Sequence, residues 1–263
     1  EYEEKILSSS EQTILLENSI FEKLVETILN NVKTIQNNSN IIAQLDIISS
    51  HAVTARTNNY IKPKIIDKST KFVVKKSKHP VIENLLPPGE KFISNDIDLD
   101  NNKKQIAIIT GPNMAGKSTF LRQVGLIAIL GQIGSYVPAK SAEISIIDQL
   151  FTRVGASDNL AGGESTFLVE MNETANILNN ATPNSLIILD EIGRGTSTFD
   201  GLSLAWSITE YLHNNIQIKA KTLFATHYHE LIELAELLPD AFNLNSVVDE
   251  HDGEIIFLRK IKK

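Results

Sequence analysis

The first part of the chain carries an apolar stripe with the spacing of a helix. Between residues 8 and 35, apolar side chains recur at steps of three, four and seven, which places them on one helical face. These side chains are Ile14, Phe21, Leu24, Val25, Ile28, Val32 and Ile35. The polar run at residues 37–40 predicts a break, after which a second stripe begins. We therefore expect two helices over residues 8–57, and Pro63 forbids further helix.

Shorter extended segments are expected after the helical region. Residues 72–74 have the composition of a strand, residues 87–89 predict a turn, and Phe92 opens another extended segment. The last part of the chain, residues 247–261, is typical of a hairpin that turns at residues 251–253.

From Gln105 onward, short apolar runs alternate with helical stretches. The runs lie at residues 106–109, 186–189 and 222–225, and nearly every side chain in them is apolar. Strands buried on both faces have this pattern, which favours a parallel sheet covered by helices. We predict an α/β fold with a mostly parallel sheet flanked by helices. Its domain covers residues 61–263, and a helical segment, residues 1–60, precedes it.

Composition excludes several classes of protein. With 263 residues, 42% of them apolar and 22% charged, the chain has enough apolar material for a sizeable core. The absence of cysteine excludes disulfides and zinc sites built from cysteine. A net charge of −7 argues against a general electrostatic footprint on DNA. The seven lysines between residues 62 and 78 are typical of solvated surface.

The chain shows no sign of a membrane partner. No apolar run approaches the ~20 residues needed to cross a bilayer. The first residues have neither the pattern of a signal peptide nor that of a transit peptide. The chain opens without Met inside a helical pattern, so we expect a fragment of a longer protein.

The strongest motif is a glycine-bracketed loop between a predicted strand and a predicted helix. It consists of Gly111, Pro112, Asn113, Met114, Ala115, Gly116, Lys117 and Ser118. This string is G-x-x-x-x-G-K-[ST] without deviation, the phosphate-binding loop of P-loop NTPases. The glycines let successive N–H groups point at phosphate oxygens, and the helix N-terminus favours negative charge. Lys117 would contact the β- and γ-phosphates, and Ser118 would ligate Mg²⁺. The alternative is a glycine-rich turn with an incidental lysine.

Two acids and a histidine follow the other apolar runs. Asp190 and Glu191 end the run at residues 186–189, where a neighbouring strand would bring them to the phosphate loop. Asp190 would hold Mg²⁺, and Glu191 would orient or deprotonate the attacking water. His227 follows residues 222–226 and would sense the γ-phosphate. The alternatives are a capping role for Asp190, a surface position for Glu191 and a structural histidine.

Together these motifs resemble the MutS family of DNA mismatch repair ATPases. The resemblance is carried by residues 110–119, 151–156, 165–167, 190–197 and 224–228. Residues 162–171 resemble the bacterial members that recognise mismatches more than the paralogues that do not. It covers roughly residues 60–258, and residues 1–60 resemble the end of the helical lever that precedes the ATPase domain in that family. It implies an ABC-type ATPase fold and an enzyme that hydrolyses ATP with Mg²⁺. It also implies a head-to-head homodimer in which each ATP site is built from two subunits.

The resemblance assigns roles to further residues. Residues 160–164 are similar to the ABC signature, and Ser165 would contact the γ-phosphate held by the other subunit. Asn113 would lie on the γ-phosphate side, and Phe92 would pack on the adenine. Thr119 completes the similarity of the phosphate loop. Helix capping is the alternative for Ser165, and a core aromatic is the alternative for Phe92.

The resemblance also has limits. At Ala115 the family more often has glycine, which is harmless if the φ angle stays negative. The domains that read mismatches and the segment that locks the dimer lie outside this sequence. For the whole protein the family implies mismatched DNA and a MutL-type protein as partners, and a cytoplasmic, nucleoid-associated place in a bacterium. The competing hypotheses are an ABC transporter or chromosome-maintenance ATPase, and a module that binds ATP only to dimerise.

Overall fold

The computed structural model describes residues 2–154, 166–251 and 254–263. The chain divides into two compact units, Glu1–Thr54 and Ala55–Lys263. The first unit is helical, and the second contains both sheets and all the predicted chemistry. No helix among the described residues is both long and apolar enough to cross a bilayer.

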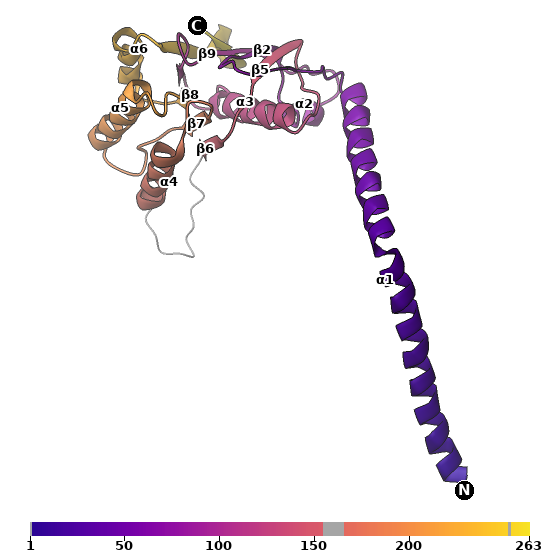
Figure 1. The fold of residues 1–263 in the computed structure, drawn as a ribbon. Helices are drawn as coiled ribbons and strands as arrows, with labels where there is room; N and C mark the ends of the chain where they lie inside the picture. The colour runs from indigo at the N-terminus through magenta and orange to yellow at the C-terminus, as the bar shows by residue number, and fades with distance from the viewer. Residues whose placement is uncertain (1, 155–165, 252–253) are drawn as a thin grey trace. The chain divides into compact units, whose positions relative to one another are not determined.

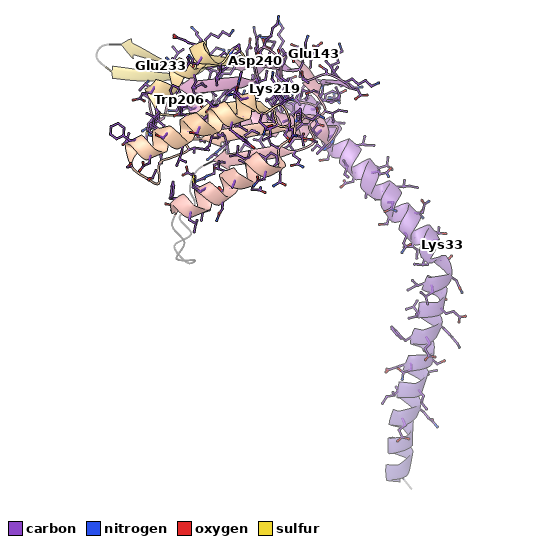
Figure 2. The ribbon with its side chains drawn as sticks, turned by 60° about the vertical axis from the view of Figure 1, so that its left-hand side comes forward. Lys33, Glu143, Trp206, Lys219, Glu233 and Asp240 are labelled. Carbon is purple, nitrogen blue, oxygen red and sulfur yellow. The ribbon has the colours of Figure 1, made fainter. Side chains whose placement is uncertain are left out.

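The N-terminal segment is one helix, so the predicted break at residues 37–40 is wrong. Helix α1 runs from Tyr2 to Thr57 without interruption. Asn and Ser cost a helix only about 0.5 kcal/mol each relative to Ala, and the segment contains neither Gly nor Pro. Some polar side chains bond to the helix itself, as Asn31 does to the Thr27 carbonyl at 2.8 Å. Figure 2 shows the side chains of α1, Lys33 among them, projecting from the helix.

A six-stranded sheet forms the centre of the second unit. Its order is β10-β9-β4-β8-β7-β6. The strands are β4 (Ile106–Thr110), β6 (Leu150–Val154), β7 (Leu186–Asp190), β8 (Lys221–Ala225), β9 (Ala241–His251) and β10 (Glu254–Lys262). Neighbours from β9 to β6 are parallel, and only β10 is antiparallel to its partner. The apolar runs therefore form β4, β7 and β8, and the structure confirms the α/β class.

The sheet separates two apolar cores, because successive side chains of a strand point to opposite faces. On one face Ala107 and Ile109 pack with helix α3 (Lys117–Gln132), which lies beside β7 and β8 (Figure 1). On the other face Ile106 and Ile108 pack with residues of helices α4 (Thr166–Asn180) and α5 (Thr198–Asn214). Burial on both faces explains why these strands have almost no polar residues.

A second sheet, which the sequence did not predict, packs into the core on the α3 face. Its four strands have the order β1-β5-β2-β3. They are β1 (Lys64–Ile66), β2 (Phe72–Ser77), β3 (Asn95–Leu99) and β5 (Ser141–Ser145). The short helix α2 (Ile82–Leu85) lies between β2 and β3. Phe92 precedes β3 and belongs to no strand, so the predicted extended segment begins three residues later.

The remaining elements follow β8 in the sequence. The 3₁₀ helix η1 (His229–Glu233) and helix α6 (Leu234–Leu237) connect β8 to β9. Strands β9 and β10 form the predicted hairpin, whose turn at residues 252–253 lies outside the described residues. Lys219 and Asp240, which are labelled in Figure 2, form an ion pair of 3.0 Å beside this end of the sheet.

Candidate functional site

The glycine-bracketed loop connects the carboxyl end of β4 to the first turn of α3. Three of its residues have positive φ angles: Gly111 at 132°, Met114 at 63° and Gly116 at 94°. A Cβ atom on Gly111 would lie 2.0 Å from Oγ of Ser246 on β9, so both the φ angle and the space require glycine. The loop is therefore held in a curled shape by its backbone and by the strand beneath it.

Ala115 fits the loop without strain. It is fully buried and is not among the residues with positive φ. Met114 carries the strain instead, since a left-handed conformation costs a side-chain-bearing residue about 1 kcal/mol or more. Its side chain is 88% exposed, so burial does not compensate for this strain.

The loop forms one wall of a cavity of about 410 Å³. Its lining consists of Ile82, Pro112, Asn113, Met114, Gly116, Lys117, Ser118, Thr119, Glu191 and Arg259. The seven loop residues and Glu191 were predicted from the sequence. Ile82 of α2 and Arg259 of β10 were missed, because they come from distant segments and belong to no recognisable motif. Asn95 holds β10 here, with Nδ2 donating to the Arg259 carbonyl at 3.1 Å.

Lys117 extends along the inside of the loop. Its Nζ donates to the carbonyl oxygens of Gly111 at 2.6 Å and Pro112 at 3.0 Å. Only 5% of the residue is exposed, and burial lowers the pKa of the ammonium, while the nearby charges of Glu191 and Asp190 raise it. A buried ammonium at the N-terminus of a helix is an arrangement that favours an anion.

Asp190 has an oxygen without a protein partner. The residue ends β7 and is 9% exposed, and its Oδ1 has no hydrogen-bond partner among the described residues. Burial raises the pKa of this carboxyl, whereas a hydrogen bond from Ser118 lowers it. An unpaired buried carboxylate oxygen next to a hydroxyl group fits the ligand set of Mg²⁺, which takes few protein oxygens and completes its shell elsewhere. No cluster of three or more His, Asp or Glu side chains suited to a metal occurs in the described part of the chain.

Glu191 has a strained backbone conformation. Its φ is 59°, a conformation that costs about 1–3 kcal/mol and clusters at functional sites. Its N–H donates to the Ala225 carbonyl at 2.9 Å, which ties it to β8. Its carboxylate lies 2.7 Å from Arg194 and 4.0 Å from Lys117. The acid thus lies at the cavity, but β8 separates β7 from β4, so the prediction that the two strands are neighbours is wrong.

His227 lies at the end of β8, within the influence of the same charges. The residue is exposed, and its ring packs against Tyr228, with ring centroids 4.1 Å apart. Partial desolvation lowers the pKa of the imidazole, and the charge of Arg194 lowers it further. The ring is therefore neutral at neutral pH and able to accept or donate one hydrogen bond.

Several predicted residues do not line this cavity: Gly111, Ala115, Asp190, His227 and Phe92. Phe92 is half-buried. Ser165 and residues 160–164 lie outside the described residues, which resume at the start of α4.

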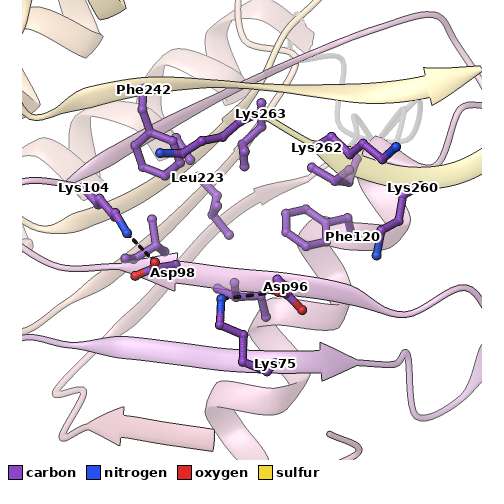
Figure 3. Close-up of a pocket in the computed structure, with 15 residues that line it drawn as sticks. Lys75, Asp96, Asp98, Lys104, Phe120, Leu223, Phe242, Lys260, Lys262 and Lys263 are labelled. Atoms are coloured by element: carbon purple, nitrogen blue, oxygen red, sulfur yellow. Dashed lines mark hydrogen bonds and ion pairs between the residues drawn. The ribbon is translucent and has the colours of Figure 1, made fainter. Parts of the chain in front are cut away.

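A second cavity, of about 360 Å³, has a different character. Its floor is apolar, with Phe120, Leu223 and Phe242 among the lining residues, and lysines surround it (Figure 3). Lys75 pairs with Asp96 at 3.3 Å, and Lys104 pairs with Asp98. Lys75 and Lys104 are neutralised by these pairs, and no glycine-rich loop lines the space, so this cavity lacks the phosphate loop that lines the first one.

Comparison with known proteins gives one consistent family. The model of the family "MutS domain V" matches residues 107–263. A DNA mismatch repair protein MutS of Salinibacter ruber is 55% identical over 261 residues, which is 99% of this chain and 29% of that relative. The corresponding proteins of Bacteroides thetaiotaomicron and Chlorobium limicola are 53% and 55% identical, over 100% and 99% of this chain and 30% of each relative. The chain thus spans about three tenths of the length of these relatives.

Proposed function

The chain belongs to the MutS family of DNA mismatch repair proteins, and from this premise we propose that it binds ATP with Mg²⁺ and hydrolyses it. The observation that carries the proposal is the meeting of three strand ends. β4 delivers the phosphate loop, β7 delivers Asp190 and Glu191, and β8 delivers His227. Ligands of open parallel sheets bind at the carboxyl ends of the strands, which is where these residues lie.

The loop supplies the phosphate site. Residues 111–118 curl around a space bordered by Lys117, and α3 begins at Lys117 with Gly116 as its N-cap, so the helix N-terminus adjoins the same space. A phosphate oxygen would take the place of the Gly111 and Pro112 carbonyls as partner of Lys117. Asn113 and Thr119 line the same cavity and are the remaining polar candidates for the nucleotide.

Ser118 and Asp190 would hold Mg²⁺. The ion would neutralise charge that develops on the phosphates. Burial keeps Asp190 in a weakly solvated place, where an unpaired oxygen is available as a ligand or as an acceptor for a water of the ion.

Glu191 would orient and deprotonate the attacking water. Its carboxylate faces the cavity and is shared at present between Arg194 and Lys117. His227 would contact the γ-phosphate or the water as a neutral ring. Arrangements of this kind act by positioning and electrostatics more than by covalent chemistry.

For the whole protein we propose the family's mode of action. Two subunits would complete each ATP site, with Ser165 of one contacting the nucleotide of the other. Nucleotide state would then control the grip on mismatched DNA and the contact with a MutL-type protein. Phe92 stays a prediction as the adenine contact. Membership of this family disfavours the alternatives of a transporter or chromosome-maintenance ATPase.

The test compares Mg²⁺-dependent ATP hydrolysis by the full-length protein with hydrolysis by Glu191→Gln. Loss of a general base slows catalysis by about 10²–10⁴-fold, so turnover should fall by at least about a hundredfold while ATP still binds. Glu233→Gln, which changes an exposed acid of η1 in the same way, should behave like the wild type. Equal turnover in Glu191→Gln and wild type would contradict the assigned role, and no hydrolysis by the wild type would contradict the function.

A further inference from the structure

The turn that carries Glu191 is held in place by a peptide two residues away. Ile192 is fully buried, and Gly193 follows it with a φ of 90°. A Cβ atom on Gly193 would lie 2.7 Å from the Gly201 backbone in the first turns of α5, so only glycine allows this approach. The strained φ angle of Glu191 therefore persists because the residues after it are tightly fixed.

Both polar groups of Gly193 are bonded to side chains from other elements. Its N–H donates to Oε1 of Glu170 on α4 at 2.5 Å, and its carbonyl accepts from the Tyr228 hydroxyl at 3.1 Å. Glu170 and Tyr228 are 4% exposed each, so both bonds form away from water. Buried hydrogen bonds of this kind are costly to break, because the group left behind finds no water.

Glu170 is itself fixed by an ion pair. Its Oε2 lies 3.5 Å from the Arg153 guanidinium, which also pairs with Glu173 at 3.1 Å. Burial and the charge of Glu170 raise the pKa of Tyr228, so the phenol remains a proton donor at neutral pH. Gly195 adds a second contact to α4, since a Cβ atom there would lie 3.0 Å from Cβ of Phe167. The turn is thus attached to α4 at two points and to the His227 segment at a third.

We propose that Glu170 and Tyr228 are positioning residues for ATP hydrolysis, which hold the Gly193 peptide from both sides and so fix the direction of the Glu191 carboxylate. This proposal rests on the proposed function. Neither residue lines the cavity, so neither contacts the nucleotide. Both residues would act on hydrolysis by fixing the backbone of the turn that carries Glu191. The bond from this turn to Glu170 would also couple the position of α4 to Glu191.

The sharpest variant is Tyr228→Phe in the full-length protein, because it removes one oxygen and keeps the ring against His227. We expect kcat to fall by about ten- to a hundredfold, the range for a displacement of about 1 Å, whereas the dissociation constant of ATP stays close to wild type. The melting temperature should fall slightly, because the Gly193 carbonyl loses a buried partner. Tyr211→Phe, on the exposed face of α5, is the matched control and should change neither constant.

A pair of acids on α4 separates the Gly193 contact from the ion pair. Glu170→Ala removes both, Glu170→Gln keeps an acceptor for the Gly193 N–H, and Glu173→Gln removes only a partner of Arg153. We expect a loss of kcat in Glu170→Ala, partial recovery in Glu170→Gln and wild-type kcat in Glu173→Gln.

The outcomes that would overturn the proposal are distinct from a failure of the proposed function. If the wild type hydrolyses ATP and Tyr228→Phe has an unchanged kcat, the positioning role is refuted and the function stands. If Tyr228→Phe loses ATP affinity together with kcat, the contact is structural only. A wild type without ATP hydrolysis refutes the function and, with it, the positioning role.

Discussion

Two buried lysines lie at opposite edges of the parallel part of the six-stranded sheet, one at the carboxyl ends of its strands and one at their amino ends. Lys117 follows the carboxyl end of β4 and is 5% exposed, and Lys221 begins β8 at the amino end and is fully buried. Burial lowers the pKa of both ammonium groups. Residue type and burial alone therefore do not distinguish them.

The surroundings of the two lysines differ. Lys117 borders a cavity of about 410 Å³, among residues with strained backbone and beside the unpaired Oδ1 of Asp190. Lys221 is enclosed: its Nζ lies 3.5 Å from Oδ1 of Asn101, and the charges of Asp148 and Asp100 are near. A buried charge alone therefore does not identify a binding site. A cavity, strained backbone and unpaired polar atoms beside the charge do.

The largest expected effect is on nucleotide affinity. Lys117→Ala removes charge-assisted bonds to phosphate and should weaken ATP binding by at least about a hundredfold, or ~3 kcal/mol. Lys221→Met should leave ATP affinity unchanged. Titration calorimetry on the full-length protein measures both, and similar losses in the two variants would remove the distinction between the two ends of the sheet.

A smaller effect is expected when Lys221, at the amino end of β8, is replaced, and it concerns the free energy of unfolding. Folding lowers the pKa of Lys221 from 10.5 to about 8, so between these values the unfolded chain binds more protons and wild-type stability rises with pH. Lys221→Met removes the buried charge and should raise the free energy of unfolding by about 2 kcal/mol below pH 8. The gain should shrink as the pH rises through the lowered pKa, which urea unfolding on both sides of it measures. A gain that does not depend on pH would show that packing, not charge, is responsible.

The smallest effect concerns the strained loop. Met114→Gly should raise the free energy of unfolding by about 0.5–1 kcal/mol, because glycine adopts the positive φ without strain and an exposed side chain is lost. Asn113→Gly is the control, since Asn113 has no positive φ and glycine should destabilise it. Thermal unfolding compares the two, and a loss of stability in both would mean that Met114 is not strained.

Local patterns predicted the parts of the molecule that depend on neighbours in sequence. The phosphate loop and Glu191 follow short buried strands, and Asp190 ends one of them. Such strands are recognisable because nearly every side chain in them is apolar. The break predicted at residues 37–40 was wrong, because Asn and Ser weaken a helix only slightly and the helix continues through them. The prediction gave these polar residues too much weight as helix breakers.

Contacts between distant segments were not predictable. Ile82 and Arg259 both line the cavity, although they lie 29 positions before and 148 positions after Gly111 in the chain. Glu170 has the appearance of an ordinary helix acid in the sequence, and its bond to Gly193 joins α4 to the turn after β7, 23 positions along the chain. Nothing local separates such a residue from a solvated one.

Lys117 also bears on how a ligand would be received. Fixing a lysine side chain costs up to about 2 kcal/mol of conformational entropy. Two carbonyl groups of the loop already restrain this ammonium, so that ordering takes place when the chain folds. An arriving phosphate oxygen would exchange places with a carbonyl oxygen. The side chain would lose little further freedom, and the loop is in this sense preorganised.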